Sequence, residues 1–328
     1  MKNSDLNPYL IQNALCKYGN QAFISKVSTA VKAKDICFAL LVVVIWGVNF
    51  SVIKMGLEQL PPLLFSGLRF AVVALPAVFF VPRPKTSFWN VLAVGLFLGV
   101  FKFGLLFVAM QEDASAGLSS LILQAQVFFT IALSYWIFSE KLNRWQVFGI
   151  AVALVGFLVF ALQDSAHITQ KGLVLILSAA LFWAFSNLIM KRMQGVNILH
   201  FMVWVSLVPP LPLFLLSYFS ESQQPLQLLS QSNVASWLSL GYVAYISTLV
   251  AFALWGQLLK QYSAASVTPF ALLIPVVGIA SSALWLDEQL ALNEILGAGL
   301  IMLGLSINVL LPVWIRVRND KSDPNRVD

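Results

Sequence analysis

The stretch that decides the fold is ICFALLVVVIWGVNFSVIKMG, residues 36–56. It is apolar over about 20 residues, the length that a helix needs to cross the hydrocarbon core of a bilayer. Polar Asn49 and charged Lys54 interrupt it, and such side chains cost free energy inside a membrane unless something compensates for them. The stretch therefore predicts a membrane-spanning helix with two polar groups that need a partner, a cavity or a route to the surface.

The rest of the chain repeats this pattern. Of its 328 residues 59% are hydrophobic and only 10% are charged, and the mean hydropathy is +0.84, whereas about a quarter of a soluble domain is charged. We predict an all-α integral membrane protein with ten transmembrane helices and no soluble domain. The predicted spans are 36–56, 62–81, 88–110, 115–138, 145–162, 172–190, 198–219, 235–258, 264–286 and 292–312.

The basic residues orient these spans. Most of the 20 lysines and arginines lie in the two tails, 1–35 and 313–328, or in alternate short loops, and lysine and arginine mark the cytoplasmic side. We therefore predict that both termini are cytoplasmic and that the net charge of +6 reflects topology and not nucleic-acid binding. The amino-terminal tail could carry a short amphipathic helix around residues 8–23 or be a mobile extension.

The two halves of the chain, 36–162 and 172–312, share a pattern. Four residues recur later at one constant offset: Glu140, Leu142, Gly149 and Gly156 match Glu288, Leu290, Gly297 and Gly304. Trp46 and Lys54 match Trp183 and Lys191 at a shorter offset. Because each half has an odd number of spans, the second half enters the membrane with the opposite orientation, and such inverted repeats are typical of secondary transporters.

Five stretches carry a resemblance to a known family. They are LLVVVIWGVNFSVIKMGL at 40–57, PPLLFSGLRF at 61–70, AGLSSLILQAQVFFT at 116–130, LLIPVVGIASSALWLDE at 272–288 and GAGLIMLGLSINV at 297–309. They resemble the EamA branch of the drug/metabolite transporter superfamily, most closely the bacterial O-acetylserine/cysteine exporters.

The resemblance implies two inverted five-helix repeats around a central cavity, in a bacterial inner membrane, and export of amino acids or related metabolites from the cytoplasm. Another substrate or direction, a membrane enzyme and a non-transporting interaction protein stay open as alternatives. The expected partners are a small-molecule substrate and the lipid bilayer, and the expected state is a monomer or weak homodimer. The energy source, proton antiport or facilitated diffusion, also stays open.

Two cations lie deep within predicted spans. Lys102 is near mid-depth in the third span, too far from either surface for its side chain to reach a headgroup. We expect it to face a cavity, where it could bind a substrate carboxylate, or to meet a structural partner. Arg69, about a third of the way into the second span, could hold helix geometry or contact substrate. Lys54 and Lys191 lie near span ends, where reaching the surface is the favoured explanation.

Amide and indole side chains complete the candidate substrate-binding set. Asn49 and Trp46 lie on one helix face, and Asn49 could bind a ligand or tie two helices together. Trp183 and Asn187 form the corresponding pair in the sixth span. Gln124 and Gln126, two residues apart, point in different directions, so one can face the cavity and the other should bond a neighbouring helix. The candidate set is Trp46, Asn49, Arg69, Lys102, Gln124, Gln126, Trp183 and Asn187.

The sequence offers no enzyme signature, and we expect no cofactor and no metal site. It contains no GxxxxGK[ST], GxSxG or HExxH motif. Its two histidines, His167 and His200, are too far apart for a dyad. Glu294 is the acid within a span, either a solvated helix start or a group for proton coupling. Pro269 and Pro275 predict a kink in the ninth span.

Overall fold

The computed structural model describes residues 31–162, 167–193 and 195–321, and their regular elements are helices. The extended backbone described there is limited to short loops and an isolated bridge between Ala114 and Ile168. The all-α prediction is therefore confirmed. The suggested tail helix at residues 8–23 falls outside the described residues.

The first half of the chain forms five helical stretches, several of them made of consecutive segments. They are α2 (Ala33–Gly56), α3 (Pro62–Ala77), a third of α4 (Phe88–Val94), η1 (Gly95–Lys102), α5 (Phe103–Val108) and η2 (Ala109–Asp113), a fourth of α6 (Ala116–Ile122) and α7 (Ala125–Phe138), and α8 (Arg144–Leu162).

The described part of the second half also forms five helical stretches, with one short extra helix, α12 (Pro225–Gln231). The stretches are α9 (Gln170–Lys191), α10 (Ile198–Val205) with α11 (Pro210–Ser220), α13 (Val234–Gly241) with η3 (Tyr242–Val250) and α14 (Ala251–Gln261), α15 (Ala264–Val267) with η4 (Thr268–Leu272) and α16 (Leu273–Trp285), and α17 (Leu292–Lys321).

Nine of these stretches, within the described ranges, are long and apolar enough to cross a membrane. The predicted second span, 62–81, is a shorter apolar helix, α3, of 16 residues. It ends early because Pro76 lies in its last turn and Val81 precedes Pro82, and a residue before proline disfavours helical geometry. The other predicted spans agree with the helices to within a few residues, except that α17 continues past the predicted end at residue 312 to Lys321.

Irregular segments fall at equivalent positions of the two halves. The π-helical segments η1 and η3 interrupt the third and eighth stretches. The fourth stretch breaks at Leu123 and Gln124, and the ninth changes to a 3₁₀ segment, η4, around Pro269. Discontinuous helices and π segments free backbone groups and are frequent at functional sites. The predicted interruption of the ninth span is therefore confirmed, and the one at Gln124 was not foreseen.

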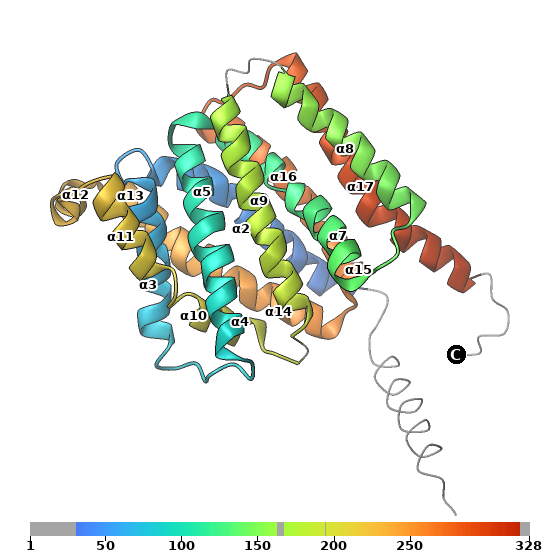
Figure 1. Ribbon diagram of the computed structural model, residues 1–328, viewed down its shortest axis with the longest axis horizontal. Coiled ribbons are helices and arrows are strands. Elements are labelled where there is room, and N and C mark those ends of the chain that lie inside the picture. Colours follow the sequence, from blue (N-terminus) through green and yellow to red (C-terminus); the bar gives the residue numbers. More distant parts are fainter. Residues whose placement is uncertain (1–30, 163–166, 194, 322–328) are drawn as a thin grey trace, which may run out of the picture.

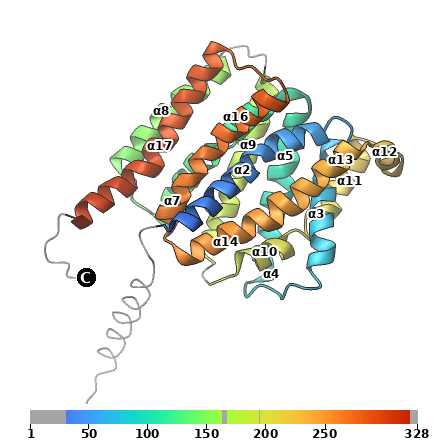
Figure 2. The ribbon, with the colours of Figure 1, turned by 180° about the vertical axis from the view of Figure 1, so that it is seen from behind.

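Close helix approach depends on the repeated glycines. Figures 1 and 2 show α8 and α17 side by side at one edge of the bundle. A Cβ atom added at Gly156 would lie 2.8 Å from the carbonyl oxygen of Gly297, and one at Gly304 would lie 2.5 Å from that of Gly149. The two backbones thus touch where the matched glycines meet, an arrangement that small residues permit in membranes.

Candidate functional site

Two buried cations lie over the same aromatic ring, that of Phe103. Lys102 ends η1 and Arg69 lies halfway along α3, and their exposed fractions are 4% and 3%. The Arg69 guanidinium carbon lies 4.0 Å from the centroid of the Phe103 ring, and the Lys102 amine lies 3.2 Å from the same centroid. The Lys102 amine is also 4.7 Å from the Trp183 ring. The two cations and these two rings form what we call the cation site.

Thr248 orients Arg69 in this site. Nη2 of Arg69 donates to the Thr248 hydroxyl over 2.9 Å, and that hydroxyl donates to the Val243 carbonyl, also over 2.9 Å. Val243 lies five residues before Thr248, so the π-helical turn of η3 supplies the acceptor. Nε and Nη1 of Arg69 are buried without a hydrogen-bond partner among the described residues.

No ion pair within the described residues balances the charge of the cation site. In the described part of the chain, neither Arg69 nor Lys102 forms an ion pair. A cation over an aromatic face gains about 0.5–2 kcal/mol, whereas removing an ion from water costs several kcal/mol. The rings therefore offset only part of the cost of burying the two charges. Such a site is suited to an anionic ligand.

Trp46 reaches the same π-helical segment from α2, and Asn49 lies on the same face of that helix. The indole Nε1 of Trp46 donates to the Ser247 carbonyl over 3.0 Å, next to the residue that holds Arg69. Its ring packs against Phe252 and Trp255, with centroids 5.3 and 5.4 Å away. Asn49, 7% exposed, has a buried Oδ1 with no hydrogen-bond partner in the described residues. It offers an acceptor on the face of α2 that carries Trp46.

The remaining amides form a separate contact between α7 and α9. Asn187 Nδ2 donates to Gln126 Oε1 over 2.6 Å and to the Thr130 hydroxyl over 3.2 Å. Gln124 lies in the break between α6 and α7 and is 8% exposed. Gln126 is therefore the glutamine that bonds a neighbouring helix. The structure brings Arg69, Lys102 and Trp183 together and places Gln126 with Asn187.

The two repeat-related lysines bind protein groups at opposite ends of the third and fourth stretches. Lys54 donates to the carbonyls of Met110, Gln111 and Ala114 over 2.5, 3.3 and 3.2 Å. Lys191 forms a 2.7 Å ion pair with Glu140. We expected Lys54 to extend toward the membrane surface. Its amine instead donates to carbonyls at and just after the end of η2.

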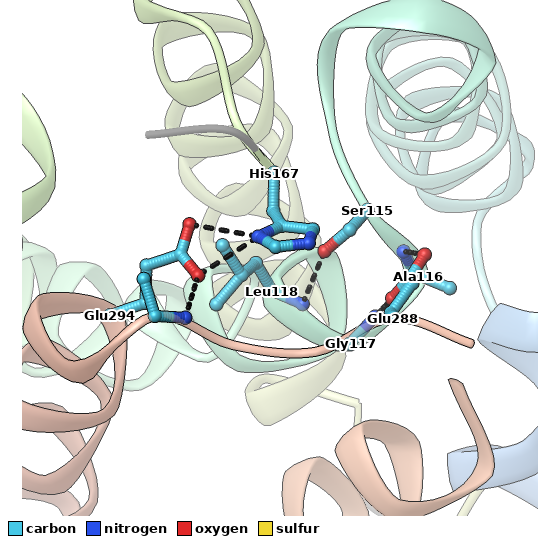
Figure 3. Close-up of polar contacts among 8 residues, drawn as sticks. Ser115, Ala116, Gly117, Leu118, His167, Glu288 and Glu294 are labelled. Atoms are coloured by element: carbon cyan, nitrogen blue, oxygen red, sulfur yellow. Dashed lines mark hydrogen bonds and ion pairs between the residues drawn. The ribbon is translucent and has the colours of Figure 1, made fainter. Parts of the chain in front are cut away.

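A cluster of loop residues that includes Ser115, His167 and Glu288 lies beside Lys54, and Figure 3 shows its polar contacts. Glu288 accepts hydrogen bonds from the backbone N–H groups of Ala116 and Gly117 over 2.9 and 3.1 Å and so caps α6. Glu294 contacts His167 Nδ1 over 2.9 Å and is 1% exposed. The suggestion that Glu294 is a solvated helix start is therefore wrong, since His167 and the Ala291 N–H replace water around its carboxylate.

This loop cluster also contains a pocket of about 220 Å³. Its lining includes Lys54, Asp113, Ser115, His167 and Glu288, and not the two cations of the cation site. No group of three or more acidic, histidine or cysteine side chains suited to a metal ion occurs in residues 31–162, 167–193 and 195–321. We therefore treat the loop cluster as part of the scaffold and the cation site as the candidate functional site.

Sequence reasoning missed Thr248 and Phe103. Thr248 is 179 residues from Arg69, and a threonine or phenylalanine in an apolar span carries no signal of its own. The pairing of His167 with Glu294, 127 residues apart, was equally invisible. The one sequence feature that pointed to an unpaired charge was the absence of acids from the spans that carry Arg69 and Lys102.

Comparison with known proteins places the chain in a family. The model of the EamA-like transporter family matches residues 33–162 and 170–310. A protein from Salmonella typhimurium strain LT2 called "Probable amino-acid metabolite efflux pump" is 45% identical over 84% of this chain and 95% of its own length. A protein of the same name from Escherichia coli K12 is 44% identical over 86% of this chain and 96% of its own.

More distant proteins share the fold. "Uncharacterized transporter YoaV" of Bacillus subtilis strain 168 is 30% identical over 81% of this chain and 94% of its own length. One crystal structure superposes with a TM-score of 0.59 at 16% identity, over 87% of this chain and 99% of its own. On the family match and on these identities, the chain belongs to the EamA-like transporter family.

Proposed function

We propose that this protein is a secondary transporter that exports small amino-acid-like metabolites from the cytoplasm, with cysteine and O-acetylserine as the model substrates. Two relatives at 45% and 44% identity are called "Probable amino-acid metabolite efflux pump", which supports export and the amino-acid class. The model substrates come from the resemblance of the sequence motifs.

The cation site is the observation that carries the proposal. Every amino-acid-like metabolite has a carboxylate, and Arg69 and Lys102 are buried cations without an acidic partner in the described residues. Charge-assisted hydrogen bonds from arginine or lysine to a carboxylate are among the strongest in proteins. In this proposal Arg69 and Lys102 bind the substrate, Trp183 and Trp46 line its path, and Asn49 supplies an acceptor.

Transport proceeds by alternating access in this proposal. The third and eighth stretches and the fourth and ninth stretches are irregular at equivalent positions, as in transporters built from inverted repeats. Each half also contributes one lysine, Lys54 or Lys191, and the two lysines lie at opposite ends of the bundle. Lys191 pairs with Glu140, while the matched residues Lys54 and Glu288 hold carbonyls and N–H groups. The two ends thus make different polar contacts, and in this proposal these contacts form and break as the two ends open in turn.

The proposed setting is a bacterial inner membrane with ten membrane helices and both termini in the cytoplasm. Among the described residues nine stretches have the length of a span, and α3 is the short tenth helix in this proposal. The chain acts as a monomer or weak homodimer. The end that carries Lys191 and Glu140 then faces the cytoplasm, and the loop cluster faces outward.

Metabolite profiling of overproducing cells tests this function. Cells that overproduce the wild-type protein should release more of at least one amino-acid-like metabolite into the medium than cells with Lys102→Ala or an empty vector. A new reaction product instead of a redistributed metabolite would indicate an enzyme. Equal release from wild type and Lys102→Ala, with equal protein in the membrane, would refute the assignment of the site.

A further inference from the structure

We propose that Lys102 carries the proton that drives export, and that the protein exchanges one outgoing zwitterion for one incoming proton. This inference rests on the proposed function, because it names the energy source of transport through the same site. It follows from three features. One basic side chain of the cation site has a permanent charge and the other a removable one, both lie over one ring, and an amino-acid substrate brings its own ammonium to that ring.

The two basic side chains of the site differ in how they hold their proton. A guanidinium stays protonated in proteins, so Arg69 keeps its charge in every state of the cycle. A lysine ammonium is a compact, strongly hydrated charge, and lysine gives up its proton readily when it is buried. Lys102 is 4% exposed. Arg69 is therefore the fixed cation of the site, and Lys102 is the group whose charge can change.

The surroundings of Lys102 make its charged form costly. Its amine lies 3.2 Å from the centroid of the Phe103 ring, and the Arg69 guanidinium carbon lies 4.0 Å from the same centroid. The two charges are thus separated by no more than the sum of these distances. A like charge and the loss of water both disfavour an ammonium, and the faces of Phe103 and Trp183 offset only part of that cost. Lys102 can therefore lose or gain its proton as the contents of the site change.

No other titratable group of the neighbouring elements shares the ring with these two. The elements packed against η1 are α4, α5 and α9, and the turn between α10 and α11 lies against its glycines. In the described residues, none of these elements, nor α3 or η3, carries an aspartate or glutamate. Their tyrosines on η3 donate to backbone carbonyls. The remaining titratable side chains lie near helix ends and are Lys171, Lys191, His200 and Tyr218.

A zwitterion brings a competing ammonium to the same ring. Its carboxylate accepts hydrogen bonds from the Nε and Nη1 donors of Arg69, which have no partner in the described residues. Because the ammonium of an amino acid is bonded to the carbon next to that carboxylate, it then lies close to the aromatic faces that Lys102 occupies. Two ammonium groups repel each other there, so Lys102 releases its proton. Its neutral amine accepts a hydrogen bond from the substrate's ammonium and donates one to the carboxylate.

The exchange of proton for substrate follows from this competition. With the site open to the outside, an external proton binds the Lys102 amine as the substrate leaves. With the site open to the cytoplasm, an entering substrate displaces that proton into cytoplasmic water. The aromatic position thus holds one ammonium in each direction, and each cycle moves one zwitterion out and one proton, with its charge, in. An acidic or electrically positive exterior therefore drives export.

Coupled fluxes in proteoliposomes test the proposal. Vesicles with purified wild-type protein and the pH dye pyranine are loaded with labelled cysteine or O-acetylserine at pH 7, and potassium with valinomycin clamps the membrane potential. Lowering the external pH from 7 to 6 should accelerate efflux at least threefold. After subtraction of the leak in protein-free vesicles, about one proton should enter for each molecule that leaves. N-Acetylserine, the isomer of O-acetylserine without an ammonium, should draw in no proton.

Variants of two lysines assign the coupling to the site. Lys102→Met should lose net efflux and proton entry, but at saturating substrate it should exchange internal labelled for external unlabelled substrate within threefold of the wild-type rate. Exchange moves only the loaded site across the membrane, so it needs no proton and shows that the variant folds and binds. Lys85→Met, a change of an exposed loop lysine, should keep both fluxes. If Lys102→Met does not fold, Lys102→Arg, whose charge cannot be removed, should admit no protons, and the wild-type ratio of protons to substrate decides alone.

Three results would overturn the inference while the proposed function stands. The wild-type protein could export either substrate with no proton entry and no effect of external pH. N-Acetylserine could draw in protons as O-acetylserine does. Lys102→Met could keep the wild-type coupling, which would place the proton carrier elsewhere. If neither cysteine nor O-acetylserine leaves faster than from protein-free vesicles at either pH, the proposed function fails as well.

Discussion

At the scale of single residues, the cation site depends on how a few neutral groups hold Arg69. The Thr248 hydroxyl accepts from the guanidinium and donates to the π-helical carbonyl of Val243. It therefore links the position of a charge to an irregular turn of another helix. Ser66, which lies nearly one turn before Arg69 on α3, has a buried hydroxyl with no such bond in the described structure.

Thr248→Val should weaken substrate binding while preserving the fold. A hydrogen bond to a charged group contributes about 1.5–3 kcal/mol, so we expect KM for efflux to rise about tenfold with little change in the maximal rate. The matched control is Ser66→Ala, which removes a hydroxyl without breaking a described hydrogen bond and should leave KM within threefold of wild type. A tenfold rise in both variants would contradict the positioning role of Thr248.

The amide pair between α7 and α9 is a second test at this scale. Gln126→Leu and Asn187→Leu each break the 2.6 Å hydrogen bond, and interhelical bonds in membranes contribute about 0.6 kcal/mol on average. Each single variant should lower the unfolding free energy in detergent. The loss in the double variant should be smaller than the sum of the two single losses. Strictly additive losses would show that the two amides do not act as a pair.

At the scale of elements, the sequence predicted the helices better than their interruptions. Apolar runs separated by charged or proline-containing breaks define nine spans and the short helix α3 in the described residues. Each run can be recognised from its own residues, because a helix crosses the membrane when it is apolar over about 20 residues. Pro269 announces the 3₁₀ segment η4. The break at Leu123–Gln124 and the π segments η1 and η3 could not be predicted, because no residue type in the sequence marks them.

The glycine contact of α8 with α17 was visible in the sequence only as a repeat. Gly156→Ala should destabilise the protein by about 1–3 kcal/mol, since the new methyl group meets a backbone oxygen and the core resists overpacking. Gly299 lies on the same helix, and a Cβ atom added there would have no neighbouring atom within 4 Å. Gly299→Ala should therefore be neutral or slightly stabilising. Thermal unfolding of both variants in detergent measures the difference, and an equal Tm would argue against the close approach.

At the scale of the whole molecule, the repeat and the charges of the loops support one orientation. Composition and charge predicted a membrane bundle and its sides, and the family match agrees with the transporter class. The partners of Arg69 and Glu294 could not be predicted, because Thr248 and His167 come from other helices and loops far along the chain. Arg69 and Lys102 were predicted singly from their depth and Trp183 from the repeat, and the bundle brings these three residues together around Phe103.

Cysteine labelling tests the orientation. In a background with Cys16→Ser and Cys37→Ser, a cysteine at Gln223 should react with a membrane-impermeant maleimide on intact cells. A cysteine at Lys141 should react only after permeabilisation. Both positions are exposed in loops, so burial does not limit their labelling. The reverse pattern would place the termini outside and reverse the direction in which the two ends of the bundle open.

The central claim is that amino-acid-like metabolites cross the membrane through the site of Arg69 and Lys102. The most direct measurement is efflux of preloaded amino acids from proteoliposomes that contain only the purified wild-type protein or Lys102→Met at equal density. We expect the wild-type protein to accelerate efflux of at least one amino acid at least tenfold over protein-free vesicles, and Lys102→Met to lose most of that acceleration. Equal efflux with both proteins would contradict the account.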